Sequence, residues 1–121
     1  MATLTTTNND IESSLTLTAG AGDDTGASTD VRASFGGVAF LKLTNGATGP
    51  TVAAQIELQG SGDDTVWYSI GGPLVGTTGN SEVTSWRIEY GIGDMYIRAV
   101  AGSNTGQNVS MDFDLTTTAI A

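Results

Sequence analysis

Apolar and polar residues alternate along most of this chain, a pattern typical of β-strands with one buried face. In the segment 109–115 the odd positions are apolar, and the even positions are Ser110, Asp112 and Asp114. The segment 38–43 is apolar on both faces except at Lys42, which predicts a central strand buried on both sides. The other predicted strands are 14–18, 31–35, 51–59, 66–70, 86–90 and 95–100.

Residues that favour turns separate these segments, and residues that favour helices are scarce. The clearest hairpin runs from Leu58 to Tyr68, with Gly-Ser-Gly-Asp-Asp between its two strands. Turn signals at this spacing are typical of sandwiches. The chain is therefore predicted to be all-β, a single antiparallel β-sandwich of about eight strands, with jelly-roll-like and immunoglobulin-like strand orders both open.

The first twelve residues differ from the rest because they are rich in Thr and Asn and carry only Leu4 and Ile11 as apolar anchors. We interpret 1–12 as an extended polar N-terminal arm and 13–121 as the β-sandwich domain. Leu4 and Ile11 are then candidates for contact with a neighbouring molecule. The start lacks the basic-then-apolar pattern of a signal peptide, and no apolar run approaches the roughly 20 residues of a membrane span. We expect synthesis in the cytoplasm and no membrane partner.

Composition and charge narrow the function classes. The 121 residues include no His and no Cys, which excludes histidine acid–base catalysis, thiolate nucleophiles and the usual zinc, copper, haem and iron–sulfur sites. Asp and Glu number 13 against 4 Lys and Arg, giving a net charge of −9. Because a nucleic-acid backbone is neutralised by clustered cations, no nucleic-acid partner is expected. We expect a non-enzymatic protein without a cofactor.

The tetrapeptide Gly-Asp-Asp-Thr occurs twice, with Asp23 and Asp24 in one copy and Asp63 and Asp64 in the other. One interpretation is a pair of loops that share a Ca²⁺ ion, since this cation prefers carboxylate and carbonyl oxygens. The other is ordinary turn chemistry, in which Asp accepts hydrogen bonds from backbone groups two residues on. Neither loop has the spaced ligand series of an EF-hand, so no metal is assigned.

Asp112 and Asp114 also form a carboxylate pair, about 6.5–7 Å apart along one face of a strand. Paired carboxylates are the catalytic groups of glycosidases. The alternative is that they form the solvated side of the strand. Nothing in the sequence indicates an apolar pocket that would raise either pKa, and we interpret them as the polar side.

The aromatic residues suggest a contact surface. Trp86 is expected in the core together with Ile88 and Tyr90, since the three share one face of their strand. Trp67 and Tyr68 are adjacent and must point to opposite faces, so one is expected in the core and the other outside. An exposed ring could anchor a protein interface or stack on a sugar.

The stretch 52–68, Val-Ala-Ala-Gln-Ile-Glu-Leu-Gln-Gly-Ser-Gly-Asp-Asp-Thr-Val-Trp-Tyr, resembles a hairpin of tailed-phage virion proteins. The composition, rich in Thr, Ala and Gly, free of Cys and poor in Lys, is similar to that of small capsid decoration (cement) proteins. The resemblance implies a structural protein on the capsid surface of a virion, made in the host cytoplasm. Its implied partners are the major capsid protein and further copies of itself, a homo-oligomer such as a trimer. It implies no catalytic residues.

Two alternatives stay open. One is another phage component of the head, neck or tail, because the same type of hairpin and composition fits such proteins. The other is a carbohydrate-binding β-sandwich module, in which Trp67 or Tyr68 would stack on a sugar.

Overall fold

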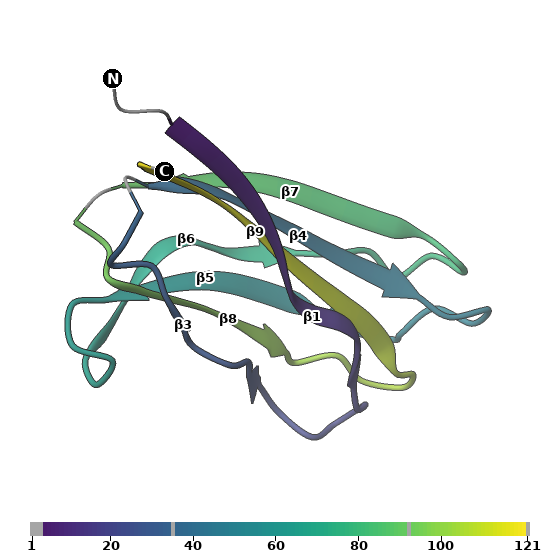
Figure 1. Ribbon diagram of the computed structural model, residues 1–121. Helices are drawn as coiled ribbons and strands as arrows, with labels where there is room; N and C mark the ends of the chain where they lie inside the picture. Colours follow the sequence, from purple (N-terminus) through teal and green to yellow (C-terminus); the bar gives the residue numbers. More distant parts are fainter. Residues whose placement is uncertain (1–3, 35, 92, 121) are drawn as a thin grey trace.

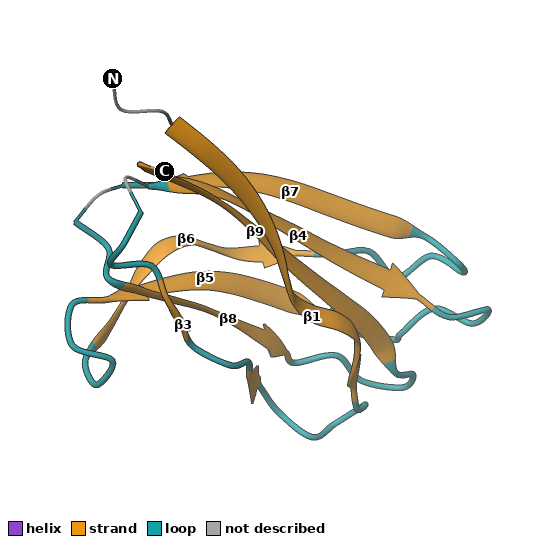
Figure 2. Ribbon diagram, in the orientation of Figure 1, coloured by secondary structure: helices purple, strands orange, loops and turns teal. Residues whose placement is uncertain are grey.

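The computed structural model describes residues 4–34, 36–91 and 93–120, and these form nine strands and no helix (Figures 1 and 2). Two antiparallel sheets pack face to face, which confirms the predicted all-β antiparallel sandwich. The part of the chain described here holds no helix that is long and apolar enough to cross a membrane. The strands are β1 (Leu4–Leu17), β2 (Asp24–Thr25), β3 (Thr29–Asp30), β4 (Gly37–Asn45), β5 (Gln55–Ser61), β6 (Trp67–Val75), β7 (Val83–Tyr90), β8 (Tyr96–Gly102) and β9 (Val109–Ile120).

The strand order decides between the two sandwich types. One sheet has the order β1-β9-β4-β7 and the other β2-β8-β5-β6, with β3 also paired to β8. The chain thus passes repeatedly from one sheet to the other, and its first and last strands are neighbours. This is the double Greek key of a jelly roll, so the jelly-roll alternative is the one realised.

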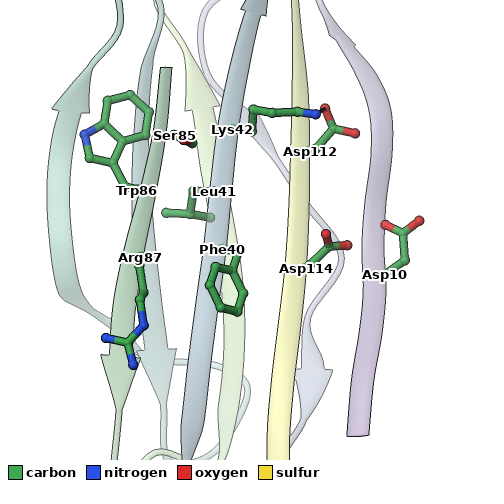
Figure 3. A pocket seen from close by; sticks show the side chains of 9 residues that line it. All are labelled: Asp10, Phe40, Leu41, Lys42, Ser85, Trp86, Arg87, Asp112 and Asp114. Atoms are coloured by element: carbon green, nitrogen blue, oxygen red, sulfur yellow. Dashed lines mark ion pairs between the residues drawn. The ribbon is translucent and has the colours of Figure 1, made fainter. Parts of the chain in front are cut away.

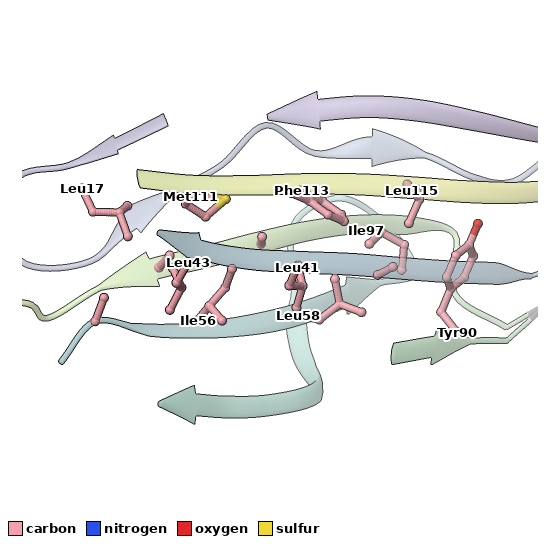
Figure 4. Packing of buried hydrophobic residues seen from close by; sticks show 14 of the residues in the cluster. Leu17, Leu41, Leu43, Ile56, Leu58, Tyr90, Ile97, Met111, Phe113 and Leu115 are labelled. Carbon is pink, nitrogen blue, oxygen red and sulfur yellow. The ribbon is translucent and has the colours of Figure 1, made fainter. Parts of the chain in front are cut away.

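The core lies between the sheets, and period-two alternation places its residues (Figure 4). Val109, Met111, Phe113 and Leu115 of β9 are all buried, as their odd positions predict. They meet inward residues of β4, β5 and β8. Those with the largest buried side chains are Leu41, Leu43, Ile56, Leu58 and Ile97.

Two strand predictions were wrong. Strand β4 is buried on one face only: Phe40 is 43 % exposed and Lys42 lies beside it on the solvent side, because the second sheet covers only the other face. The segment 31–35 is not a strand in its described part. The Ser34 N–H donates to the Val31 carbonyl at 3.0 Å, closing a turn, while Phe35 lies outside the described residues.

The predicted hairpin around 58–68 is confirmed, with β5 and β6 as its two strands. The Asp63 carboxylate accepts the backbone N–H groups of Thr65 and Val66, each at 2.9 Å, and Asp64 adopts a positive φ of 61°. These bonds lower the pKa of Asp63, the bond from Val66 most strongly. Turn chemistry therefore accounts for this Gly-Asp-Asp motif.

The N-terminal segment is extended and lies along the edge of a sheet. From Leu4 to Asp10 its backbone pairs residue by residue with β9, and register shifts follow between Asp10 and Glu12 and between Glu12 and Leu15. Residues 1–3 lie outside the described part. The division into an arm at 1–12 and a domain at 13–121 stays a prediction.

Candidate interaction surfaces

A hollow of about 370 Å³ lies on the solvent side of the sheet β1-β9-β4-β7 (Figure 3). All four strands contribute to it, so it exists only when the whole sheet is assembled. Its lining residues are Asp10, Phe40, Leu41, Lys42, Ser85, Trp86, Arg87, Asp112 and Asp114.

Strand register arranges the outward side chains of this hollow in rows. Asp10 lies opposite Asp114, Asp114 opposite Phe40, and Phe40 opposite Arg87, which makes one row across the four strands. The next row along β9 places Asp112 opposite Lys42. The hollow therefore has an acidic side on β1 and β9 and an apolar and basic side on β4 and β7.

The two carboxylates predicted as a pair have different surroundings. Asp112 forms an ion pair with Lys42 at 3.8 Å and accepts the backbone N–H of Ser14 at 3.0 Å. Asp114 faces Asp10, and burial followed by this neighbouring carboxyl raises the pKa of Asp114 above its ordinary value. Asp112 weakly supports the same direction, while Lys42 opposes it.

This arrangement suits recognition better than glycoside hydrolysis. A glycosidase pair acts from the two sides of a bound glycosidic bond. Here Asp112 and Asp114 lie side by side on one strand face, and the Asp112 carboxylate is already engaged by Lys42 and Ser14. An exposed aromatic ring and an arginine beside a polar rim, as with Phe40 and Arg87 here, are features of protein interfaces.

Trp67 and Tyr68 do point to opposite sides, but the expectation that one of them lies in the core was wrong. Trp67 is on the outer face of the second sheet, where the Arg98 guanidinium stacks on its ring at 4.0 Å from the centroid. Tyr68 is 45 % exposed, and its hydroxyl donates to Asp94 at 2.7 Å, which raises the tyrosine pKa. Both residues begin β6, which is an edge strand of its sheet, and neither is buried.

Arg98 continues a polar chain on that outer face. Its Nε donates to the Gln59 side-chain oxygen at 2.8 Å, and the Gln59 amide donates to Glu57 at 2.9 Å. One face of the Trp67 indole is thereby occupied by the guanidinium. A sugar platform would need that face free or would have to use the other one.

Trp86 lies on the inner face of its strand, as predicted, together with Ile88 and Tyr90. Tyr90 is buried, whereas Trp86 and Ile88 are only half-buried and pack against the margin of the core. The reason is that β7 is an edge strand of its sheet.

The two Asp pairs considered for calcium are not brought together. Asp24 lies opposite Ala101 at one end of β8, while Ser61, which leads into the Asp63–Asp64 turn, lies opposite Tyr96 at the other end. That is about 16 Å of strand. Asp23 instead accepts the Ser103 hydroxyl at 2.8 Å. In the described ranges no three acidic side chains are grouped so that they could hold a metal ion.

The remaining interface candidates have different positions. Leu4 pairs through its backbone with Ile120 at the end of β9. Ile11 is half-buried, packs against the core and lines a smaller hollow with Val31. Phe40 and Arg87 line the larger hollow but were not predicted from the sequence as surface candidates. The signal was present in the apolar segment 38–43, where Phe40 occupies an outward position.

No family model matches this sequence, and no curated protein matches it. Solved structures share its fold. VP2 of infectious bursal disease virus, in its subviral particle, matches with a TM-score of 0.63 and 11% identity over 97% of this chain and 33% of VP2. The SPBc2 prophage-derived protein YomS matches with a TM-score of 0.54 and 13% identity over 96% of both chains. The PBSX exported protein XepA matches with a TM-score of 0.58 and 10% identity over 95% of this chain and 37% of XepA.

The chain thus spans about a third of VP2 and of XepA and nearly all of YomS. Identities this low show a common fold and nothing beyond it. By fold, this protein is similar to a β-sandwich in a viral particle protein and to one in a prophage-derived protein.

Proposed function

We propose that this protein is a non-enzymatic structural component of a virion, a capsid decoration or cement protein of a tailed phage. The observation that carries the proposal is the match with YomS over 96% of both chains, since it pairs this sandwich with a phage-derived protein of the same extent. The VP2 match adds that the same sandwich occurs within a protein that assembles into particles. Its partners are the major capsid protein and further copies of itself.

Charge and surface chemistry support this role. A net charge of −9 keeps a coat component soluble and gives it no affinity for the genome. The hollow on the β1-β9-β4-β7 sheet offers Phe40 as an apolar anchor beside Arg87, Lys42 and three carboxylates. Aromatic anchors ringed by polar groups supply much of the affinity in protein interfaces. We assign this face to the capsid contact.

The test is co-sedimentation with purified particles of the virus that carries the gene. A decoration protein is present in a fixed ratio to the major capsid protein, and recombinant protein rebinds to particles from which it has been stripped. Phe40→Ser should abolish rebinding. Val75→Ser, which removes another exposed apolar side chain on the edge strand β6, is the matched control and should rebind normally.

Other outcomes would overturn the proposal. Labelling confined to necks or tails in electron micrographs would assign the protein to those parts of the virion. Absence from particles combined with binding on a glycan array would favour a carbohydrate-binding module. Normal rebinding of Phe40→Ser would remove the β1-β9-β4-β7 face as the contact surface.

A further inference from the structure

The four sheet edges of this sandwich are not equally protected. An open strand edge presents unpaired N–H and C=O groups, and proteins usually blunt such edges with bulges, prolines or very short strands. Three edges here follow that rule. β2 and β3 are two residues long each, β1 has two register shifts, and β6 has register shifts and carries Gly71, Gly72 and Pro73.

Strand β7 differs because it is regular over its whole length, whereas β1 is regular only from Leu4 to Asp10. It pairs with β4 over eight consecutive residues without a register shift, and it contains neither Gly nor Pro. Among the described residues, no strand of the sheet lies along its other side. A regular strand with an open side is a template for another strand.

The inward side chains of β7 lie at an incompletely covered margin of the core. Trp86 and Ile88 point inward but remain half-buried. Ile88 packs closely on Gly71 of the second sheet, where an added Cβ would lie 2.8 Å from the Ile88 Cδ1. Part of the Trp86 and Ile88 side chains nevertheless stays uncovered at the margin of the sandwich.

The outward side chains of β7 carry a charge pattern that complements itself. Arg87 and Glu89 lie two residues apart on the solvent face, 57 % and 72 % exposed, with 3.1 Å between their charged groups. Two residues that lie opposite each other in an antiparallel pair point to the same face of the sheet. A two-fold axis normal to the sheet keeps each residue on its own face. The axis must therefore pass beside a residue that lies opposite its own copy. With the axis at Ile88, Arg87 of each copy lies opposite Glu89 of the other. An axis at Arg87 or Glu89 would oppose like charges, which is destabilising.

We infer that β7 pairs antiparallel with β7 of a second copy of this chain, about a two-fold axis at Ile88, joining two four-stranded sheets into one. Main-chain hydrogen bonds, two Arg–Glu contacts and the contact of the half-buried Ile88 with its own copy on the inner face hold the dimer. We assign a second copy of this chain to the open edge of β7 because, in this register, the Arg87 of each copy meets the Glu89 of the other. The inference rests on the self-association in the proposed function. Sedimentation of the isolated protein measures this self-association without any capsid.

Sedimentation equilibrium of the full chain should give a dimer of twice the 12.3 kDa chain mass. Arg87→Glu and Glu89→Arg should each raise the dimer Kd at least about tenfold, because each opposes like charges twice. The two substitutions change the net charge in opposite directions, so loss of the dimer in both cannot come from net charge. Mixing the two variants should restore a dimer, since the two acidic side chains of the Arg87→Glu strand then face the two basic side chains of the Glu89→Arg strand.

The matched control is Arg32→Glu, which reverses an equally exposed arginine beside β3, at the far edge of the other sheet, and should leave the dimer unchanged. Melting curves verify that each variant is folded. A monomeric wild-type chain, or single variants that both dimerise normally, would overturn the inference. Either result would leave particle binding through the Phe40 face standing, so the two proposals fail separately.

Discussion

Asp10 of β1 and Asp114 of β9 lie directly opposite each other on the solvent side of one sheet. Two carboxylates in this position repel each other when both are ionised. The backbone pairing of β1 with β9 holds them opposite each other despite this repulsion. Burial of Asp114, and then the presence of Asp10, raises the pKa of the Asp114 carboxyl above its ordinary value of 3.8.

The first prediction follows from that raised pKa. The folded state holds the Asp114 proton more tightly than the unfolded chain does. The stabilisation that this carboxyl contributes is therefore fully present below pH 3.8, and it is lost as the pH rises through the pKa of Asp114 in the folded protein. Asp114→Asn removes the repulsion and should raise the melting temperature at pH 7 by about 1–4 °C. The gain over wild type should shrink as the pH falls towards 4.

Asp112→Asn is the control for that experiment. Asp112 is paired with Lys42 and accepts the Ser14 N–H, so its neutralisation should bring no gain at pH 7. An Asp114→Asn protein that melts at or below the wild-type temperature at pH 7 would contradict the repulsion between Asp10 and Asp114.

The second prediction concerns Gly37, at the start of β4. A Cβ at this position would overlap the Thr116 carbonyl oxygen and approach the Tyr90 hydroxyl at 2.7 Å. Because the carbonyl belongs to the backbone of β9, it cannot move aside cheaply, and Gly37→Ala should cost about 1–3 kcal/mol. Gly62→Ala in the β5–β6 turn meets nothing within 4 Å and should stay within about 0.5 kcal/mol of wild type. Urea denaturation compares the two.

The third prediction separates the two phenylalanines on neighbouring strands. Phe113 is fully buried, so Phe113→Ala should cost about 3–5 kcal/mol and Phe113→Leu considerably less. Phe40 lies on the solvent face, and Phe40→Ala should cost about 1 kcal/mol or less while weakening particle binding. Denaturation curves measure both changes. Equal losses of stability in Phe113→Ala and Phe40→Ala would mean that Phe40 belongs to a covered face.

The fourth prediction concerns calcium. Since Asp23 and Asp24 lie at the opposite end of β8 from Asp63 and Asp64, the melting temperature should be the same in millimolar Ca²⁺ and in chelator. An increase with Ca²⁺ that Asp63→Asn abolishes would show that the β5–β6 turn binds the ion by itself.

Periodicity predicted the parts of this fold that depend on one face being buried. Every apolar position of 109–115 enters the core, and the Gly-Asp-Asp hairpin forms where the turn residues place it. Periodicity did not predict which strands have both faces covered, because that depends on how the two sheets pack. Phe40 is as apolar as its buried neighbours, but the second sheet covers only one face of β4.

The candidate site was less accessible to sequence reasoning. Asp112 and Asp114 could be placed on one face from their spacing, but the opposing Asp10 and Lys42 come from strands whose pairing no local pattern specifies. Trp67 was assigned by alternation to one of two faces. Its stacking on Arg98 depends on the β5–β6–β8 arrangement, which the sequence does not reveal.

The place of β9 in its sheet also governs how the chain can fold during synthesis. β9 is the last of the nine strands along the chain, yet it lies between β1 and β4 and hydrogen bonds to both. Until it leaves the ribosome, β1 has no partner and β4 has one open side. Such long-range pairing makes folding slow and leaves strands exposed to other nascent chains. Slower synthesis of β9 therefore lengthens the time during which β1 and the open side of β4 can pair with other chains.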